Sequence, residues 1–69
     1  MDKNIERHSL SEWRRLRGLS QEKVGEACGV HPNTVRFWEK SPGKIPAGKV
    51  INLLQVLNID FDQLNFFNF

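Results

Sequence analysis

Two histidines and one cysteine are the side chains of this sequence whose chemistry most often serves catalysis or metal binding. His8, Cys28 and His31 lie far apart in the sequence. No Cys, Asp or Glu accompanies either histidine at ligand spacing together with the second shell that a metal site needs. The sequence also contains no nucleophile elbow, glycine-rich phosphate loop or convergent pair of carboxylates. We therefore expect neither an enzyme nor a protein that uses a metal or cofactor.

The charged residues are unevenly distributed along the chain. Residues 1–49 carry all 10 Lys and Arg and six of the 8 acidic residues, a balance of +4, whereas residues 50–69 carry only Asp60 and Asp62, a balance of −2. A basic face on a small domain favours a polyanion as partner. A solvated surface without a partner gives the same distribution, so both interpretations stay open on charge alone.

Length and apolar content predict one intracellular domain. The 69 residues are near the lower limit at which a hydrophobic core alone holds a fold together. A single cysteine excludes an internal disulfide, and no apolar run approaches the roughly 18 residues that span a bilayer. The charged amino end lacks the apolar stretch of a signal peptide, so we expect a cytoplasmic, nucleoid-associated protein. We expect an arm over residues 1–8, a folded domain over 9–65 and an apolar tail over 66–69.

The segment from 19 to 39 has the spacing of two short helices joined by a tight turn. Apolar residues recur three and four positions apart on both sides of Gly29. They are Val24, Ala27 and Cys28 before it, and Val30, Val35 and Trp38 after it. Gly29 suits the left-handed conformation that ends a helix, and Pro32 suits the first turn of the next helix. So short a break forces the second helix steeply across the first, which predicts a helix-turn-helix at about residues 21–40.

The flanking segments predict the helices that support this pair. Ser9 and Glu12 fit a capping box, and Ser20 caps the second helix. The buried stripe that follows Ser9, until Gly18 ends the helix, consists of Leu10, Trp13 and Leu16.

The carboxyl half predicts a loop and two more helices. Residues 41–46 contain two prolines and a glycine, which deny them regular pairing. The apolar face of a central helix over 47–58 consists of Val50, Ile51, Leu53, Leu54 and Leu57. Asp60 and Gln63 cap a last short helix that packs Phe61 and Leu64 inward. No strand signal competes, so the predicted fold class is all-α, a compact five-helix bundle.

From Leu10 to Leu64 the pattern resembles the Cro and phage-repressor family of helix-turn-helix DNA-binding domains, the lambda repressor-like type. The residues that carry the resemblance fall at the spacings of that family. They are Leu19-Ser20-Gln21, Gly25, Gly29, Val30, Val35, Trp38-Glu39, Pro46 and the stretch from Val50 to Asp60. This chain departs from the family pattern at Pro32, where many relatives have a polar base reader, and at Ser41, where relatives often have glycine. It also carries Pro42 as an extra residue without an amide N–H.

The resemblance implies a role for each matched position. The residues implied to face bases in the major groove are His31, Pro32, Asn33, Arg36 and Phe37. Of these, Asn33 can bind adenine and Arg36 guanine through paired hydrogen bonds, and Phe37 can cover a thymine methyl. The implied phosphate contacts are Gln21, Thr34, Lys40 and Lys44. Arg14 and Glu39 match a structural ion pair between the first and third helices.

Other residues are expected to have structural or solubilising roles and no specific part in DNA binding. Trp13 and Trp38 are expected in the core, and Cys28 is expected to be an inert buried thiol. The expected solubilising charges are Lys3, Arg15, Arg17 and Lys23. Three interpretations remain for Phe66, Phe67 and Phe69: they fold back on the core, fray, or form the interface of a homodimer.

Two functional hypotheses follow from the resemblance. The first is a bacterial or phage transcriptional regulator, a Cro-like or compact repressor that binds a two-fold operator in double-stranded DNA as a homodimer. The second is a protein-interaction module on the same fold, an antitoxin or anti-repressor. Pro32 and the modest net charge of +2 favour the second hypothesis. Neither hypothesis includes a membrane or a small-molecule ligand.

Overall fold

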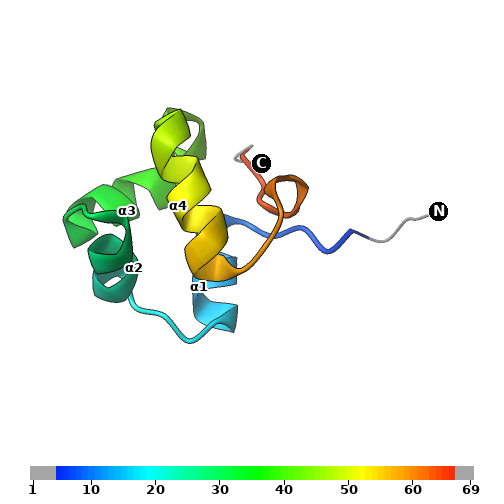
Figure 1. Cartoon of the computed structure of the whole chain (residues 1–69), viewed down its shortest axis with the longest axis horizontal. Coiled ribbons are helices and arrows are strands. Elements are labelled where there is room, and N and C mark those ends of the chain that lie inside the picture. Colours follow the sequence, from blue (N-terminus) through cyan, green and yellow to red (C-terminus); the bar gives the residue numbers. More distant parts are fainter. Residues whose placement is uncertain (1–4, 67–69) are drawn as a thin grey trace.

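The computed structural model describes residues 5–66, which form four α-helices and two 3₁₀ turns. The helices are α1 (Leu10–Leu16), α2 (Gln21–Cys28), α3 (Pro32–Lys40) and α4 (Ala47–Leu57), and the turns are η1 (Pro42–Lys44) and η2 (Phe61–Gln63). In Figure 1, α4 crosses the middle of the molecule, with α2 and α3 on one side and the first and last described segments, residues 5–8 and 64–66, on the other. Within residues 5–66 the β-structure is limited to one bridge between His8 and Leu64, and no helix is long and apolar enough to cross a membrane.

Local capping signals fix where the first helices begin and end. The Ser9 hydroxyl accepts a hydrogen bond from the Glu12 N–H, and the Glu12 carboxylate accepts one from the Ser9 N–H at 3.0 Å, so the predicted capping box is present. Ser20 caps α2 by accepting from the Lys23 N–H at 3.0 Å. Gly18 and Gly29 have φ values of +70° and +71°, which suit the left-handed turns after α1 and α2.

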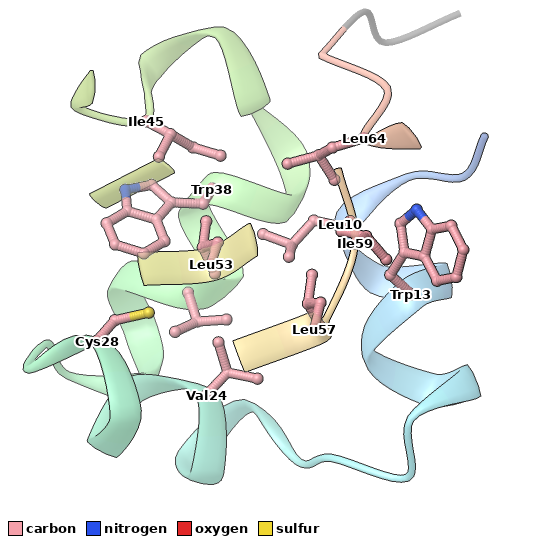
Figure 2. Close-up of a cluster of buried hydrophobic side chains, with 11 residues drawn as sticks. Leu10, Trp13, Val24, Cys28, Trp38, Ile45, Leu53, Leu57, Ile59 and Leu64 are labelled. Carbon is pink, nitrogen blue, oxygen red and sulfur yellow. The ribbon is translucent and has the colours of Figure 1, made fainter. Parts of the chain in front are cut away.

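The core lies between the four helices and extends to the carboxyl-terminal segment. Its buried residues are Leu10, Trp13, Val24, Cys28, Val35, Trp38, Ile45, Leu53, Leu57, Ile59 and Leu64. Trp38 and Trp13 lie at opposite ends of this cluster, with Leu53 and Leu57 of α4 between them (Figure 2). The core position predicted for both tryptophans is thus confirmed, and α4 is the central helix of the fold.

The fifth predicted helix is not confirmed, because residues 61–63 form only a 3₁₀ turn. The Gln63 side chain does accept from the Asp60 N–H at 2.9 Å, as expected of a cap. However, the Gln63 carbonyl accepts from the His8 N–H at 3.1 Å and from Trp13 Nε1 at 2.7 Å. The chain beyond Gln63 then runs beside His8, with the Asn65 N–H donating to the His8 carbonyl at 2.9 Å. Pairing with the amino end therefore replaces continuation of a helix.

Four apolar residues that the sequence pattern placed inside are exposed. Leu16, Ile51 and Phe61 are 58%, 60% and 63% exposed, and Ala27 is also at the surface. In α1 each step of three residues falls about 60° short of a full turn, so Leu16 has rotated past the buried edge set by Trp13. Phe61 packs instead on the ring of Phe66, at a centroid distance of 5.1 Å.

Candidate nucleic-acid interface

The close approach of α2 to the start of α3 is set by two glycines. A Cβ atom added at Gly25 would lie 2.7 Å from the carbonyl oxygen of Val30 and 3.4 Å from the nitrogen of Pro32. The Val30 N–H in turn donates to the Gly25 carbonyl at 2.9 Å. With Gly29 left-handed in the turn, the backbone of α2 meets the beginning of α3 directly. The two helices are therefore held in one fixed orientation by backbone contact.

The amino end of α3 is capped by a histidine side chain. His31 is the residue before the helix, and its Nδ1 accepts a hydrogen bond from the Asn33 N–H at 3.0 Å. Pro32 occupies the first helical position, where its missing N–H leaves no bond unmade. His31 and Asn33 are exposed and Pro32 is half-buried. Three of the predicted base contacts thus lie together at this end of α3.

The outward face of α3 carries the other two predicted base contacts. Asn33, Arg36 and Phe37 stand three and four positions apart, so they share one side of the helix. All three are exposed, Phe37 to 50%. Val35 and Trp38, on the opposite side, are buried in the core. No described residue forms a hydrogen bond or ion pair with the side chains of Asn33 or Arg36, which leaves their donors and acceptors available to a partner.

Cations extend this face toward η1. Lys40, the last residue of α3, and Lys44, the last of η1, are both exposed. The sole acidic residue between positions 31 and 44 is Glu39, and its side chain is turned inward. Thr34, the remaining predicted phosphate contact on α3, is half-buried. The exposed charges of the segment from α3 to η1 are accordingly all positive.

A polar network links α1, α2 and α3 behind this face. Arg14 Nε lies 2.6 Å from Glu39 Oε2, and these two side chains are 13% and 11% exposed. Arg14 Nη1 also donates to the Leu19 carbonyl at 3.0 Å. Gln21 Nε2 donates to the second carboxylate oxygen of Glu39 at 2.9 Å. The structure therefore brings the expected ion pair together and adds Gln21 to it.

The bond from Gln21 to Glu39 was not foreseen in the sequence. Gln21 is expected to bind a phosphate, yet one N–H of its amide is used by Glu39, which leaves the other N–H for a further acceptor. The two residues are 18 positions apart, and no local pattern connects them. Only the crossing of the start of α2 with the end of α3 places them together.

A helix-turn-helix family profile matches residues 10–64, which covers the four helices and η2. The chain belongs to the helix-turn-helix family. This match confirms the resemblance found in the sequence, and α2, the turn at Gly29 and α3 constitute its helix-turn-helix unit, residues 21–40.

Two relatives are similar to this helix-turn-helix chain. Each is named an uncharacterised HTH-type transcriptional regulator, one from Sinorhizobium medicae and the other from Rhizobium meliloti. Both are 35% identical to this chain over 46 residues, which are 67% of this chain and 33% of each relative. The chain thus aligns with about a third of the length of these relatives. No solved structure matches it.

Two cations that bind helix ends hold the helix-turn-helix unit and α1 against α4. Lys49 Nζ donates to the carbonyl of Cys28, the last residue of α2, at 2.8 Å. Arg17 Nε donates to the carbonyl of Leu57, at the end of α4, at 2.6 Å, and the Arg17 guanidinium lies 4.9 Å from the centre of the Trp13 ring. Cations suit the negative ends of helix dipoles. The interpretation of Arg17 as a merely solubilising charge is therefore wrong.

Phe66 is the one residue of the predicted dimer interface that the structure describes. It is half-buried against the core and stacks on Phe61. Phe67 and Phe69 lie outside the described residues. The folded-back position of Phe66 corresponds to one of the three interpretations offered for the tail.

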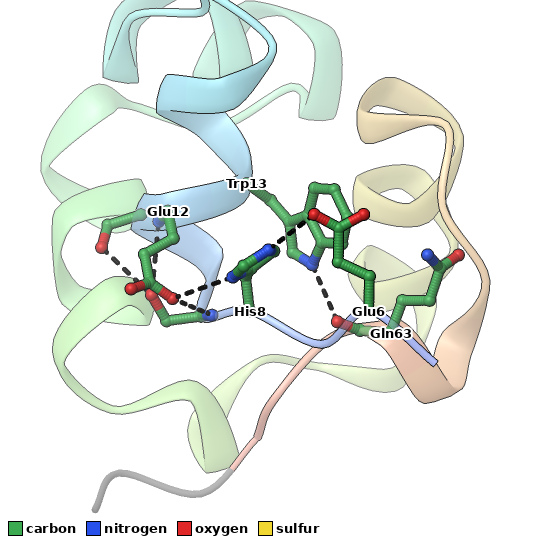
Figure 3. A network of polar contacts seen from close by, with 7 residues as sticks. Glu6, His8, Glu12, Trp13 and Gln63 are labelled. Carbon is green, nitrogen blue, oxygen red and sulfur yellow. Dashed lines mark hydrogen bonds and ion pairs between the residues drawn. The ribbon is translucent and has the colours of Figure 1, made fainter. Parts of the chain in front are cut away.

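The His8 side chain lies outside the helix-turn-helix unit and contacts two acidic residues and a tryptophan near the amino end. Its Nε2 lies 2.9 Å from Glu6 and its Nδ1 3.5 Å from Glu12, while its ring meets Trp13 edge-on at 4.8 Å between centroids (Figure 3). The backbone hydrogen bond from Ser9 lowers the pKa of the Glu12 carboxyl. Among residues 5–66, no three His, Cys, Asp or Glu side chains are grouped as a metal ion would require.

The buried position of Cys28 predicts a slowly reacting thiol. Cys28 is 3% exposed, and burial raises the pKa of its thiol, although the nearby Lys49 ammonium acts in the opposite direction. The core of a domain of this size rarely supplies more than about 3–5 kcal/mol. We therefore expect a thiol reagent such as DTNB to label native Cys28 on the order of a hundredfold more slowly than in urea.

A matched control for this labelling combines Cys28→Ala with Leu16→Cys, because Leu16 is exposed on the same domain. That variant should react at similar rates with and without urea. Rapid labelling of native wild-type protein would contradict the buried position of Cys28.

Proposed function

We propose that this protein is a sequence-specific DNA-binding transcriptional regulator that inserts α3 into the major groove. The observation that carries the proposal is the outward row of Asn33, Arg36 and Phe37, which is exposed on a helix anchored from behind by Val35 and Trp38. A base-reading helix needs this combination of a rigid inner side and unengaged polar groups outside. The names of the two relatives, both HTH-type transcriptional regulators, agree with it.

The chemistry of the row defines how bases would be read. The Asn33 amide can pair with N6 and N7 of adenine, and the Arg36 guanidinium with O6 and N7 of guanine. Phe37 offers an apolar contact to the methyl group of thymine. Pro32, beside them, can act only through its shape, because it has no donor.

Phosphates on either side would fix the position of α3 in the groove. Lys40 and Lys44 supply positive charge at one end of the helix. Gln21 supplies the second N–H of an amide already oriented by Glu39, and Thr34 supplies a hydroxyl. These contacts give affinity and register, whereas the row on α3 gives sequence preference.

A homodimer on a two-fold operator would read more base pairs than one copy of the domain can reach. The 9 residues of α3 span only about 13 Å, so one copy reads few base pairs. Two copies with half-sites one helical turn apart would supply the missing specificity, as helix-turn-helix dimers do. The residues that we assign to dimerisation are Phe66, which lies beside the exposed ring of Phe61, and Phe67 and Phe69, which lie outside the described residues. Repression would follow by exclusion of polymerase from the operator.

A second candidate function is a protein-interaction module, an antitoxin or anti-repressor. The observation that favours it is the exposure of Phe61, at 63%, together with Phe37, at 50%. Exposed aromatic side chains are common at protein interfaces. In this case the contacts of the domain would be with another protein, and its basic surface would be incidental.

Selection from random duplex DNA at low and moderate salt tests the proposal. We expect an enriched two-fold symmetric site with half-site centres about 10 base pairs apart, and affinity that falls steeply as salt rises. Weak binding without an enriched motif at either salt concentration would contradict the regulator and favour the interaction module.

A further inference from the structure

We propose that His31 presents one hydrogen-bond donor, its Nε2–H, to an acceptor atom of the bound DNA, because the cap of α3 fixes the tautomer of the ring. The inference rests on the proposed function, since it needs α3 to lie against DNA. It specifies which kind of DNA atom this residue can recognise.

The cap determines where the ring carries its proton. His31 Nδ1 accepts the hydrogen bond of the Asn33 N–H at 3.0 Å, so that nitrogen cannot itself bear a hydrogen. A neutral imidazole has one nitrogen that donates and one that accepts. The proton of neutral His31 therefore lies on Nε2. That nitrogen forms no hydrogen bond with any described residue, and the side chain is exposed.

The first turn of α3 offers no competing backbone donor. Pro32 has no N–H, and the Asn33 N–H is bound to the imidazole. The N–H groups of Thr34 and Val35 both donate to the His31 carbonyl, at 2.9 and 3.4 Å. Helix amino ends usually bind anions through free N–H groups, but those of Asn33, Thr34 and Val35 are occupied. An acceptor that approaches the first turn of α3 would therefore meet the Nε2–H of His31 and not a backbone N–H of the helix.

A group that only donates distinguishes between the edges of bases. It can bind N7 of a purine, O6 of guanine, O4 of thymine or a phosphate oxygen, each of which accepts. It cannot bind the amino group that cytosine presents in the major groove, because that group also donates. The neighbouring Asn33 amide both donates and accepts. His31 would thus require a hydrogen-bond acceptor on its base or phosphate, whereas Asn33 could bind a donor and an acceptor on a neighbouring base.

The experiment separates capping from DNA contact with two variants. His31→Ser keeps a good cap, because serine also accepts a hydrogen bond from the first turn, but removes the outward Nε2–H. His31→Ala removes both. Long-range ¹H–¹⁵N spectra of the free wild-type protein, at a pH where His31 is neutral, should show the Nε2–H tautomer. In DNA titrations at fixed salt with the selected site, His31→Ser should bind about two- to tenfold more weakly than wild type while melting at a similar temperature.

Modified duplexes then identify the acceptor. If it is N7 of a purine, 7-deaza substitution at one position should weaken wild type but not His31→Ser. If it is a phosphate oxygen, a methylphosphonate at one position should have that selective effect. The Nδ1–H tautomer in the free protein, or unchanged affinity and sequence preference of His31→Ser, would overturn the inference. If wild-type protein selects no site, the proposed function fails together with the DNA contact, whereas the spectra still report the tautomer separately.

Discussion

Replacement of both Asn33 and Arg36 by alanine is expected to abolish preference for the selected site while leaving the fold intact. Each bidentate contact to a base contributes about 1–3 kcal/mol of discrimination, so the double variant should lose at least about thirtyfold in specific affinity if the two terms add. Neither side chain forms a hydrogen bond or ion pair with a described residue, and alanine favours a helix at least as well as asparagine or arginine. Titration against the selected site and against unrelated duplexes measures the effect.

The single variants and a charge control make this result specific. Asn33→Ala should relax preference at an adenine and Arg36→Ala at a guanine, each at one position of the half-site. Arg15→Ala also removes one positive charge, but from the exposed surface of α1, and should change affinity for all duplexes alike and only slightly. An unchanged ratio of specific to nonspecific affinity in the double variant would exclude α3 as the base-reading helix.

Gly25→Ala is expected to cause a large loss of stability together with weaker DNA binding. Its new methyl carbon would lie 2.7 Å from the Val30 carbonyl oxygen, and backbone atoms cannot yield as a flexible side chain can. Overpacking costs about 1–3 kcal/mol, and a clash with backbone argues for the upper part of this range, which exceeds the gain of up to about 1 kcal/mol that alanine brings to a helix interior. Because α3 must shift away from α2 to make room, affinity should fall even at temperatures where the variant remains folded. Urea unfolding and DNA titration measure the two effects separately.

Gly48→Ala is the matched control for that substitution. Gly48 lies in the first turn of α4, and a Cβ atom added there would meet no atom within 4 Å. Its replacement should leave DNA binding unchanged and keep or slightly raise the free energy of unfolding, by up to about 1 kcal/mol. Equal stability and equal DNA affinity of Gly25→Ala and wild type would contradict the close approach of α2 and α3.

Much of the fold follows from signals within a few residues of one another. Ser9 with Glu12, Ser20, Gly29 and Pro32 predicted the start or end of α1, α2 and α3, and the structure has each of these boundaries. These groups act within one helical turn, where the unpaired N–H and C=O groups of helix ends find their partners. The identity of the outward residues on α3 likewise follows from the position of Pro32 and the period of the helix.

These local signals did not predict which apolar residues at the edges of the core are buried. Leu16 and Phe61 fit apolar patterns, yet they are exposed, because the periodicity of one segment does not show which neighbour covers it. The capping signal at Asp60 likewise began a turn and not a helix, since His8 and Trp13 engage the Gln63 carbonyl. Gln63 lies at least 50 positions from both of these partners in the sequence.

The sequence by itself determined the family, the helix boundaries and the residues offered on α3, because these depend on local hydrogen bonding and on spacing along one helix. The tertiary structure alone decided which polar groups meet: Gln21 with Glu39, Arg17 with the end of α4, and Lys49 with the end of α2. Each of these bonds joins residues that are distant in sequence and adjacent only once the helices cross. The physical reason is that the sequence gives the donors and acceptors of each side chain, whereas the packing of the whole domain determines which of them come within hydrogen-bonding distance.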